Sequence, residues 1–481
     1  MGFEGQGDSG EALGSDHVDR KLPGISSQLT SEFRVPRKEP HRGGEPPGWS
    51  LIRIDERKGN REMPKIAVTT RREWLTRGLG LVGIGGAVPR FLVRSALGGP
   101  TAEPDQRVLV VLQLDGGNDA LSTLVPYGNP RYYEYRKEAT RIPESEVIRV
   151  NEALGFHPHL GGWKRLLDKG WLAAVQGIGY PNPNYSHFTA TDTWLMGDPR
   201  GRQVPFGWVG RACDAGFPDS SDAKRAVAVG NSFGAGLALR GERHSGILIN
   251  DPSTFGYGSA DNDRQLATYG RLNDSGVATR AGELEWITST AITANAASEE
   301  IRRVAMAYRP KVNYPDTAYG RHLRTIAGLI AGGLSSRIYW TGRDGRFEFD
   351  THANQKPKHD GLLKELNDAL TAFWDDLDGH GQANRVLLFT ISEFGRTSKE
   401  NGNKGTDHAA ASTQFLFGPG VKPGIHGTHP SLEPEDLLPI GSSFPHSVDF
   451  RSLYATVLDK WLGISGERAL GQAWPLLDCV A

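Results

Sequence analysis

Residues 107–119 read Arg-Val-Leu-Val-Val-Leu-Gln-Leu-Asp-Gly-Gly-Asn-Asp, an apolar run that ends in a polar turn. A short and nearly continuous run of valine and leucine is typical of a parallel strand that is buried on both faces. Two later segments, 171–178 and 386–391, have the same character. The sequence therefore predicts three buried strands.

Helical patterns lie between these strands. In 360–378, apolar side chains recur at spacings of three and four, which places them on one face of an amphipathic helix. Residues 159–169 and 450–462 are also predicted to be helical. Strands that alternate with helices predict an α/β fold with a doubly wound, mostly parallel sheet flanked by helices. We expect this domain to span 105–470, with a loop-rich insertion around 200–300.

Polar residues follow each of the three predicted strands. They are the segments 115–119, 180–189 and 392–396, which contain Asp, Ser with His, and Glu with Arg. In open α/β sheets, ligands bind beyond the carboxyl ends of the strands, so the three segments indicate one site. Asp and Gly are also ordinary turn residues, and for any single segment the turn interpretation is equally good. It is the convergence of the three segments that favours a site.

Two further segments contain possible metal ligands. Phe-Asp-Thr-His-Ala-Asn (349–354) precedes the long predicted helix, and Gly-Thr-Asp-His-Ala (405–409) precedes another apolar run. Asp and His supply the oxygen and nitrogen ligands of many divalent metals. Asp350 and His352 alternate, so both face one side only if the backbone is strand-like there. Neither segment is a metal motif by itself, because an Asp that caps a helix or a His in the core is more common.

The composition argues against some classes of function. The chain carries 55 Lys and Arg and 56 Asp and Glu, and the part after residue 98 is mildly acidic with no basic run. This balance argues against binding to nucleic acid. The two cysteines, Cys213 and Cys479, are compatible with one disulfide or with two buried thiols. No haem motif or cysteine cluster is present in the sequence, which argues against electron transfer.

Two adjacent arginines, Arg71 and Arg72, precede a short glycine-rich apolar stretch. The charged start, the moderately apolar middle and the small residues that follow predict a twin-arginine signal peptide over 63–98. We therefore expect the chain to use the twin-arginine export machinery and to be periplasmic or extracellular. A stable membrane span is disfavoured, because a span needs about 20 apolar residues and Pro89 and Arg90 interrupt this stretch.

The segment before the predicted signal is polar. Residues 1–62 are rich in Gly, Pro and charged residues and poor in apolar ones. Such a segment buries too little apolar surface to offset the entropy of ordering it. We expect 1–62 to be disordered or to be upstream sequence, with translation starting at Met63.

Five motifs occur in order along the remainder of the chain. They are Leu-Asp-Gly-Gly-Asn-Asp (114–119), Ser-His-Phe (186–188), Asp-Thr-His-Ala-Asn-Gln (350–355), Ser-Glu-Phe-Gly-Arg (392–396) and Gly-Thr-Asp-His (405–408). Together they resemble a large bacterial family called domain of unknown function 1501 (DUF1501). That family is similar to a distant branch of the alkaline phosphatase and sulfatase superfamily. The resemblance implies an alkaline phosphatase-like domain with metals at the carboxyl end of the sheet.

The resemblance also implies a set of metal ligands. For one or two divalent ions (zinc, manganese, calcium or magnesium), the implied ligands are Asp115, Asn118, Asp350, His352, Glu393 and His408. The superfamily usually has Asp-His where this chain has Glu393-Phe394. Glu can replace Asp as a ligand, but Phe cannot coordinate a metal. This departure puts the second metal in doubt.

The catalytic residues implied by the resemblance are Ser186, His187 and Arg396. Ser186 is the best placed nucleophile and Thr189 is the second choice, while the lack of a Cys in this region argues against a formylglycine-type sulfatase. His187 would protonate the leaving group or orient the nucleophile, and Arg396 would hold the anion in a bidentate contact. The alternatives are a helix N-cap followed by a packed histidine, and a salt bridge from Arg396 to a nearby glutamate.

Two classes of function remain open. The first is an exported metal-dependent hydrolase of phosphate or sulfate esters, whose substrate is an anionic ester or a sulfated polysaccharide. The second is a non-catalytic exported binding protein that kept the fold with a degenerate metal site. Phe394 favours the second class, whereas the Asp and His residues of the ligand set favour the first.

Overall fold

The computed structural model describes residues 107–220, 222–252, 297–439 and 442–481. The expected N-terminal extension (1–62) and the twin-arginine signal (63–98) lie outside these residues. Within the described part, no helix is both long enough and apolar enough to cross a membrane.

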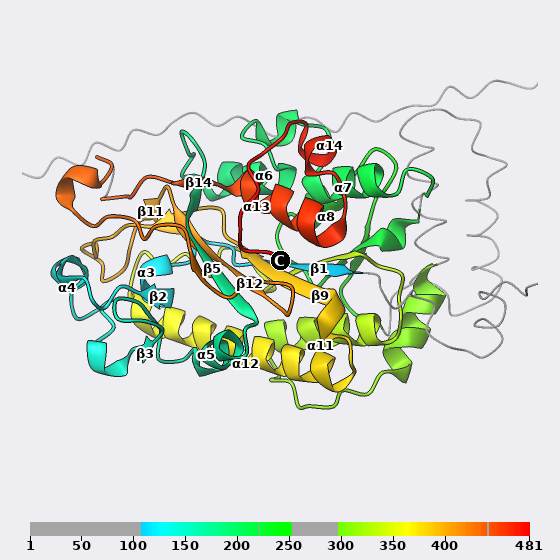
Figure 1. Ribbon diagram of the computed structural model, residues 1–481, viewed down its shortest axis with the longest axis horizontal. Helices are drawn as coiled ribbons and strands as arrows, with labels where there is room; N and C mark the ends of the chain where they lie inside the picture. The colour runs from blue at the N-terminus through cyan, green and yellow to red at the C-terminus, as the bar shows by residue number, and fades with distance from the viewer. Residues whose placement is uncertain (1–106, 221, 253–296, 440–441) are drawn as a thin grey trace, which may run out of the picture. The chain divides into compact units, whose positions relative to one another are not determined.

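A nine-stranded sheet forms the centre of the domain, in the order β13-β5-β12-β9-β1-β8-β6-β7, with β14 also paired to β5 (Figure 1). The strands are β1 (Val108–Gln113), β5 (Leu172–Gly179), β6 (Ala226–Val229), β7 (Ile247–Ile249), β8 (Ile338–Gly342), β9 (Val386–Ile391), β12 (Ser412–Phe417), β13 (Gly424–His426) and β14 (Val448–Asp449). β1 is parallel to β8 and β9, and β6 is parallel to β7 and β8, whereas β12 is antiparallel to β5 and β9. The predicted mostly parallel sheet is confirmed.

Helices cover both faces of this sheet (Figure 1). One face carries α5 (Gly161–Asp168), α11 (Ala318–Ala331) and α12 (Gln355–Gly379). The other face carries α6 (His187–Met196), α7 (Trp208–Gly216), α8 (Ala235–Leu239), α13 (Phe450–Thr456) and α14 (Gly466–Leu470). The fold is therefore doubly wound, as predicted, and a π-helical segment, Val457–Leu462, continues α13.

The side chains of β1 show why its sequence lacks a polar alternation. Val110 and Leu112 belong to the core between the sheet and α5, α11 and α12, whereas Leu109 and Val111 belong to the core on the opposite face. All four are fully buried. Since the strand is covered on both sides, each position gains roughly 1.5–3 kcal/mol from burial of an apolar side chain.

Short elements frame the carboxyl ends of the strands. β10 (Gly395–Arg396) and β11 (His408–Ala409) form an antiparallel pair in which Arg396 lies opposite His408. The other short elements are β2 (Leu124–Val125), β3 (Ile148–Arg149), β4 (Gly155–Phe156), α3 (Ala120–Thr123), α4 (Pro130–Tyr135) and the 3-10 turns Glu144–Glu146, Gly201–Gln203, Ala223–Arg225, Ala383–Arg385 and Pro434–Asp436. The β10–β11 pair brings two predicted site residues side by side.

Two helices begin at this edge of the sheet. α6 follows β5 and ends at Gly197, whose φ of 62° is the left-handed conformation that glycine adopts readily. α12 follows β8, and Pro357 lies in its first turn, where the missing N–H costs no hydrogen bond. The first residues of both helices are therefore placed at the carboxyl ends of the strands.

The described part of the expected insertion contains regular structure. β6 and β7 lie within 200–300 and belong to the central sheet, and α7 and α8 pack on its face. Residues 253–296 lie outside the described part. Cys213 and Cys479 are both buried and free.

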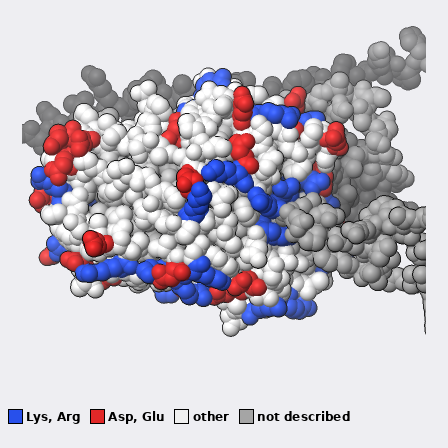
Figure 2. Space-filling view, in the orientation of Figure 1, with Lys and Arg blue, Asp and Glu red and all other residues white. Residues whose placement is uncertain are grey.

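The surface shown in Figure 2 carries Lys and Arg interspersed with Asp and Glu rather than in one continuous basic patch. Along α5, for example, Lys164 pairs with Asp168 at 2.6 Å, and the following Lys169 pairs with Asp378 of α12 at 2.8 Å. Charges on this face are therefore largely compensated by close neighbours.

Candidate metal centre

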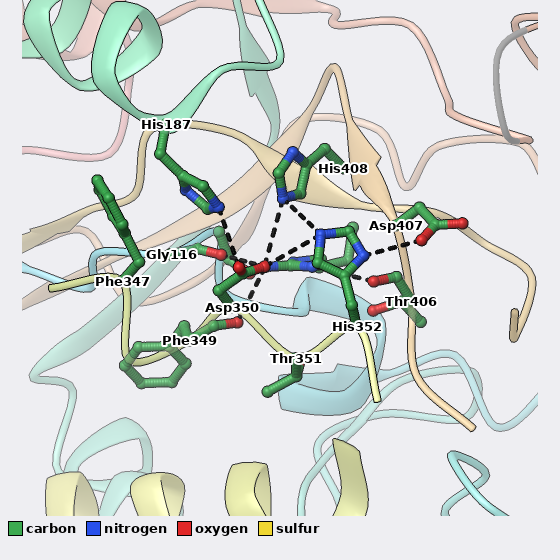
Figure 3. Close-up of polar contacts among 12 residues, drawn as sticks. Gly116, His187, Phe347, Phe349, Asp350, Thr351, His352, Thr406, Asp407 and His408 are labelled. Carbon is green, nitrogen blue, oxygen red and sulfur yellow. Dashed lines mark hydrogen bonds and ion pairs between the residues drawn. The ribbon is translucent and has the colours of Figure 1, made fainter. Parts of the chain in front are cut away.

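Three side chains from distant parts of the sequence meet at the carboxyl ends of the strands (Figure 3). His187 is the first residue of α6, Asp350 lies between β8 and α12, and His408 begins β11. One possible ligand atom from each residue lies within 4.8 Å of the other two. We call this group of three residues the metal centre.

The contacts in the metal centre converge on the carboxylate of Asp350. His187 Nε2 lies 3.3 Å from Asp350 Oδ2, and His408 Nε2 lies 3.3 Å from Asp350 Oδ1. A third imidazole, that of His352, places its Nε2 3.2 Å from Asp350 Oδ1 and 2.9 Å from His408 Nε2. Three imidazole nitrogens therefore point toward one carboxylate (Figure 3).

Each of these imidazoles is anchored at its other nitrogen. The partners of Nδ1 are Glu393 Oε1 at 2.7 Å for His187, Asp407 Oδ1 at 2.9 Å for His352, and the carbonyl oxygen of Tyr185 at 2.8 Å for His408. A carbonyl oxygen only accepts, so the Nδ1 of His408 donates, and its Nε2 presents a lone pair when the ring is neutral. Metal-binding histidines have this arrangement, because the second nitrogen is usually fixed by a carboxylate or a carbonyl.

The donor set fits a divalent cation. The Nε2 atoms of His352 and His408 are so close that one of them carries a proton when no metal is bound, since two lone pairs would repel. The Nε2 of His187 is buried and lies 3.3 Å from Asp350 Oδ2, which is longer than a typical hydrogen bond. Imidazole and carboxylate ligands suit zinc and several other divalent metals, and three protein ligands are typical of catalytic zinc sites.

Electrostatics keeps Asp350 anionic. Burial raises its pKa, but hydrogen bonds with His187, His408 and Arg396 outweigh burial and hold the pKa well below its usual range. Burial lowers the pKa of His187, whereas its hydrogen bonds to Asp350 and Glu393 raise it, and the result is a pKa of about 9. A metal must displace this proton to bind His187, so metal binding weakens as the pH falls.

Arg396 is buried and holds Asp350 in place. Its guanidinium donates to Asp350 Oδ1 at 2.7 Å. It also donates to four backbone carbonyl groups, those of Gly116, Gly117, Phe349 and Thr406. These bonds use most of its donors, so the geometry favours a positioning role over the direct anion contact expected from the sequence. The ion-pair partner of Arg396 is Asp350 and not a neighbouring glutamate.

Glu393 and Phe394 follow β9 and lie against the histidines. In addition to its contact with His187, Glu393 Oε1 accepts a hydrogen bond from the backbone N–H of Gly116 at 2.8 Å. The Phe394 ring centroid is 4.2 Å from that of His408 and 4.9 Å from that of His187. In the described part of the chain, no second group of three His, Cys, Asp or Glu residues is arranged to hold a metal. The geometry therefore fits one ion, with Glu393 supporting a ligand.

Asp115 and Asn118 lie outside the metal centre. Asp115 Oδ2 accepts a hydrogen bond from the backbone N–H of Phe347 at 2.8 Å. Burial, together with the nearby charge of Glu393, raises the pKa of Asp115 to about 7. Asn118 Oδ1 lies 3.0 Å from His359 Nε2, in the core. These contacts favour structural roles for both residues: Asp115 supports the loop that leads to Asp350.

Ser186 lies directly beside the metal centre in sequence. It occupies the N-cap position of α6, but its side chain makes no capping hydrogen bond and is exposed. Of its neighbours, His187 belongs to the metal centre, and the Tyr185 carbonyl accepts a hydrogen bond from His408. Thr189, the second candidate nucleophile, is also exposed. The Ser186 hydroxyl is therefore accessible to a ligand.

Three contributors to the site were not singled out in the sequence analysis. Asp407 and the Tyr185 carbonyl anchor two of the imidazoles. The Phe347 ring stacks on His187, with centroids 4.3 Å apart. Asp407 directly precedes His408, and this adjacency could have identified it. A backbone carbonyl such as that of Tyr185 leaves no signal in the sequence.

Comparison with protein families gives one match. The model of the family described as a protein of unknown function (DUF1501) matches residues 106–470. The chain belongs to the DUF1501 family. This match confirms the family resemblance that the five sequence motifs indicate. No curated protein matches the chain.

A comparison with solved structures finds similarities at low sequence identity. The C-terminal periplasmic domain of EcEptC from Escherichia coli, in complex with Zn, is 9% identical, with 66% of this chain and 74% of that chain covered and a TM-score of 0.32. A protein in the alkaline phosphatase superfamily from Vibrio parahaemolyticus is 10% identical, with 78% and 71% covered and a TM-score of 0.33. The PsFucS1 sulfatase from Pseudoalteromonas sp. is 10% identical, with 79% and 70% covered and a TM-score of 0.32. At these TM-scores, the similarities assign neither a substrate nor a reaction to this DUF1501 chain.

Proposed function

We propose that this chain is a metal-dependent hydrolase of phosphate or sulfate esters. The supporting observation is the convergence of three imidazole Nε2 atoms on the Asp350 carboxylate, with each Nδ1 anchored by an acceptor. These side chains lie at the edge of the sheet where α/β proteins bind ligands, and each Nε2 offers an electron pair once a metal displaces its proton. A bound divalent ion would neutralise anionic ester oxygens and lower the pKa of a nucleophile.

In this proposal, His187, Asp350 and His408 hold the ion and His352 transfers a proton. The side chain of His352 is 41% exposed, compared with 13% for His187 and 17% for His408, so it is the histidine most accessible to a leaving group. Asp407 orients its ring through Nδ1. This assignment changes His352 from the ligand implied by the resemblance to a general acid.

Ser186 is the proposed nucleophile. Its exposed hydroxyl lies at the N-terminus of the ten-residue helix α6, where the helix dipole and free backbone N–H groups favour an anion. The Ser186 hydroxyl would lose its proton to solvent as its oxygen attacks phosphorus or sulfur, and the ester bond would break to release the alcohol, which takes a proton from His352. Water then hydrolyses the serine ester and releases inorganic phosphate or sulfate.

The test uses p-nitrophenyl phosphate and p-nitrophenyl sulfate with two variants. Ser186→Ala is expected to abolish hydrolysis while the metal content stays unchanged; undiminished turnover would assign the attack to water. His352→Ala is expected to retain the metal and to slow the cleavage of alkyl esters more than that of nitrophenyl esters, whose leaving group needs less protonation. Loss of the metal in His352→Ala would make His352 a ligand.

We also propose that the chain is exported by the twin-arginine machinery and acts in the periplasm or outside the cell. The pair Arg71-Arg72 ahead of a short apolar stretch supports this location. Replacing both arginines with lysine should retain the protein in the cytoplasm, as measured by cell fractionation. Unchanged export of this variant would contradict the proposal.

A second candidate function is metal-dependent binding without catalysis. The observation in its favour is Phe394, whose ring packs against both metal-centre histidines at the position where the resemblance implies a histidine ligand. A chain that binds a metal and binds phosphate or sulfate esters in calorimetry, but cleaves none of them, would support this candidate.

A further inference from the structure

Three phenylalanines form an aromatic surface beside the metal centre. Phe188, Phe233 and Phe347 come from the loops or helix starts that follow β5, β6 and β8. Their ring centroids lie 5.3–6.1 Å apart, and all three pairs meet edge to face. Phe188 is 54% exposed, although a large apolar side chain gains free energy from burial. We call these three residues the aromatic platform.

The aromatic platform is continuous with the metal centre. The Phe347 ring stacks on the His187 ring at 4.3 Å and an interplanar angle of 23° (Figure 3). Phe188 directly follows His187 in α6. A ligand whose anionic group lies at the metal centre would therefore have its neighbouring atoms over the aromatic platform.

The backbone of Phe347 is held in an unfavourable conformation. Its φ is 55°, a left-handed conformation that is strained for a bulky residue and that tends to persist at functional sites. Asp115 stabilises this conformation, because its carboxylate accepts the Phe347 N–H and its carbonyl accepts the Phe349 N–H. Phe233 is also fixed, through a hydrogen bond from Gln113 Nε2 to its carbonyl oxygen.

Polar groups border the aromatic platform on the side of Phe233. The Arg346 guanidinium lies over the Phe233 ring, 4.9 Å from its centroid. Arg346 is itself exposed, whereas Phe233 and Phe347 are partly buried. Arg346 thus offers hydrogen-bond donors beside the exposed Phe188 and its two partly buried neighbours.

We propose that the aromatic platform binds the sugar ring of a carbohydrate ester whose phosphate or sulfate group lies at the metal centre. This inference rests on the proposed function and names its substrate class. One face of a pyranose consists of C–H groups, which pack on aromatic side chains, while its rim of hydroxyl groups needs hydrogen-bond partners such as Arg346. A plain aryl group would use the rings but not this polar border. Hydrolysis adds one water and yields the free sugar hydroxyl and inorganic phosphate or sulfate.

The experiment compares Phe188→Ala with Leu248→Ala. Leu248 is a matched control, because it is 51% exposed but lies in the edge strand β7. For each protein, kcat/KM is measured with galactose 6-phosphate, galactose 6-sulfate, the phenyl esters and the ethyl esters of the same acids. We expect Phe188→Ala to lower the preference for sugar over ethyl esters by about 10-fold, as loss of one aromatic contact implies. Leu248→Ala should leave this preference unchanged.

Two results would overturn the inference while leaving hydrolysis intact. One is an unchanged sugar-to-ethyl preference in Phe188→Ala, and the other is a loss confined to the phenyl esters. If the wild-type protein cleaves none of the esters, the proposed function fails, and calorimetry with galactose 6-sulfate and galactose 6-phosphate decides the inference separately. Binding that weakens about 10-fold in Phe188→Ala supports the aromatic platform, whereas no binding to the wild-type protein contradicts it.

Discussion

Asp119 and Asp350 are both carboxylates paired with a buried arginine, yet they belong to different kinds of structure. Asp119 is fully buried and pairs with Arg136, which is also fully buried. Asp350 pairs with the buried Arg396, but its other partners are the imidazole nitrogens of three histidines, His187, His352 and His408. We call Asp119 and Arg136 the scaffold pair.

The two carboxylates differ in how completely their partners are satisfied. Around Asp119, donors from Arg136, Gln355, Ser122 and the start of α3 occupy both oxygens. Around Asp350, His187 Nε2 is 3.3 Å from the carboxylate, and the Nε2 atoms of His352 and His408 face each other at 2.9 Å. The same carboxylate–arginine pair thus belongs to the scaffold where short hydrogen bonds occupy both oxygens, and to the candidate site where imidazole nitrogens gather around it.

The largest expected effect comes from Asp350→Ala. This variant should lose the bound metal and ester hydrolysis together, because the carboxylate contacts all three imidazoles. Metal content, enzymatic assays and circular dichroism check it, with the 94% exposed Asp316 giving the control Asp316→Ala. Metal retained at the wild-type level in a folded Asp350→Ala would remove Asp350 from the ligands.

The scaffold pair should respond in the opposite way. Asp119→Ala leaves the Arg136 charge buried without a partner and is expected to lower the free energy of unfolding by about 3–5 kcal/mol. The folded fraction should bind metal as the wild type does. Urea unfolding measures the loss, and the double variant Asp119→Ala/Arg136→Met should recover part of it. A loss below about 1 kcal/mol, the range of an exposed ion pair, would refute the role of the scaffold pair.

Glu393→Gln tests a residue that borders the metal centre and supports one of its ligands. Glu393 orients the His187 ring without joining the metal centre, so we expect metal affinity to fall by about 10- to 100-fold, as is usual for groups that support a ligand. Titration with zinc measures the affinity, and Glu435→Gln, at an exposed position, is the control. Unchanged affinity would show that the Glu393 contact does not tune His187.

The smallest expected effect concerns pH and the buried His359 next to the scaffold. Burial lowers the pKa of His359 to about 4, below the ordinary value of 6.5. As the pH falls, His359 is therefore protonated in the unfolded chain before it is protonated in the folded one. Its contribution to the free energy of unfolding is fully present above pH 6.5 and is lost as the pH falls toward 4. The free energy of unfolding should be about 2 kcal/mol lower at pH 5 than at pH 7 because of His359. Urea unfolding at both pH values should show a smaller difference for His359→Gln than for the wild type, and an equal difference would contradict the assignment.

Much of the fold could be predicted from the sequence because its strands are buried on both faces. The segments 107–114, 171–178 and 386–391 form β1, β5 and β9, and the apolar face in 360–378 lies within α12. β6 was missed because its sequence, Ala-Val-Ala-Val, is short and lies in a Gly-rich region. The antiparallel direction of β12 depends on the connection through the β10–β11 pair, which local patterns do not record.

The sequence indicates where the candidate site lies better than it indicates what each residue does there. The strand-end pattern pointed to His187, whereas Asp350 and His408 came from two segments that precede a helix and an apolar run; the structure brings the three together. The hydrogen-bond partners of the Arg396 guanidinium could not be predicted, because they include backbone carbonyl groups from three separate segments. The aromatic platform likewise exists only once three loops are folded together, so no local motif indicates it.

The most direct test of the central claim is the metal content of the purified protein, measured by inductively coupled plasma mass spectrometry. We expect about one equivalent of zinc or another divalent metal in the wild type, and its loss in Asp350→Ala and His408→Ala. A wild-type protein that is metal-free and takes up no zinc, manganese, calcium or magnesium when these are added would contradict the metal centre.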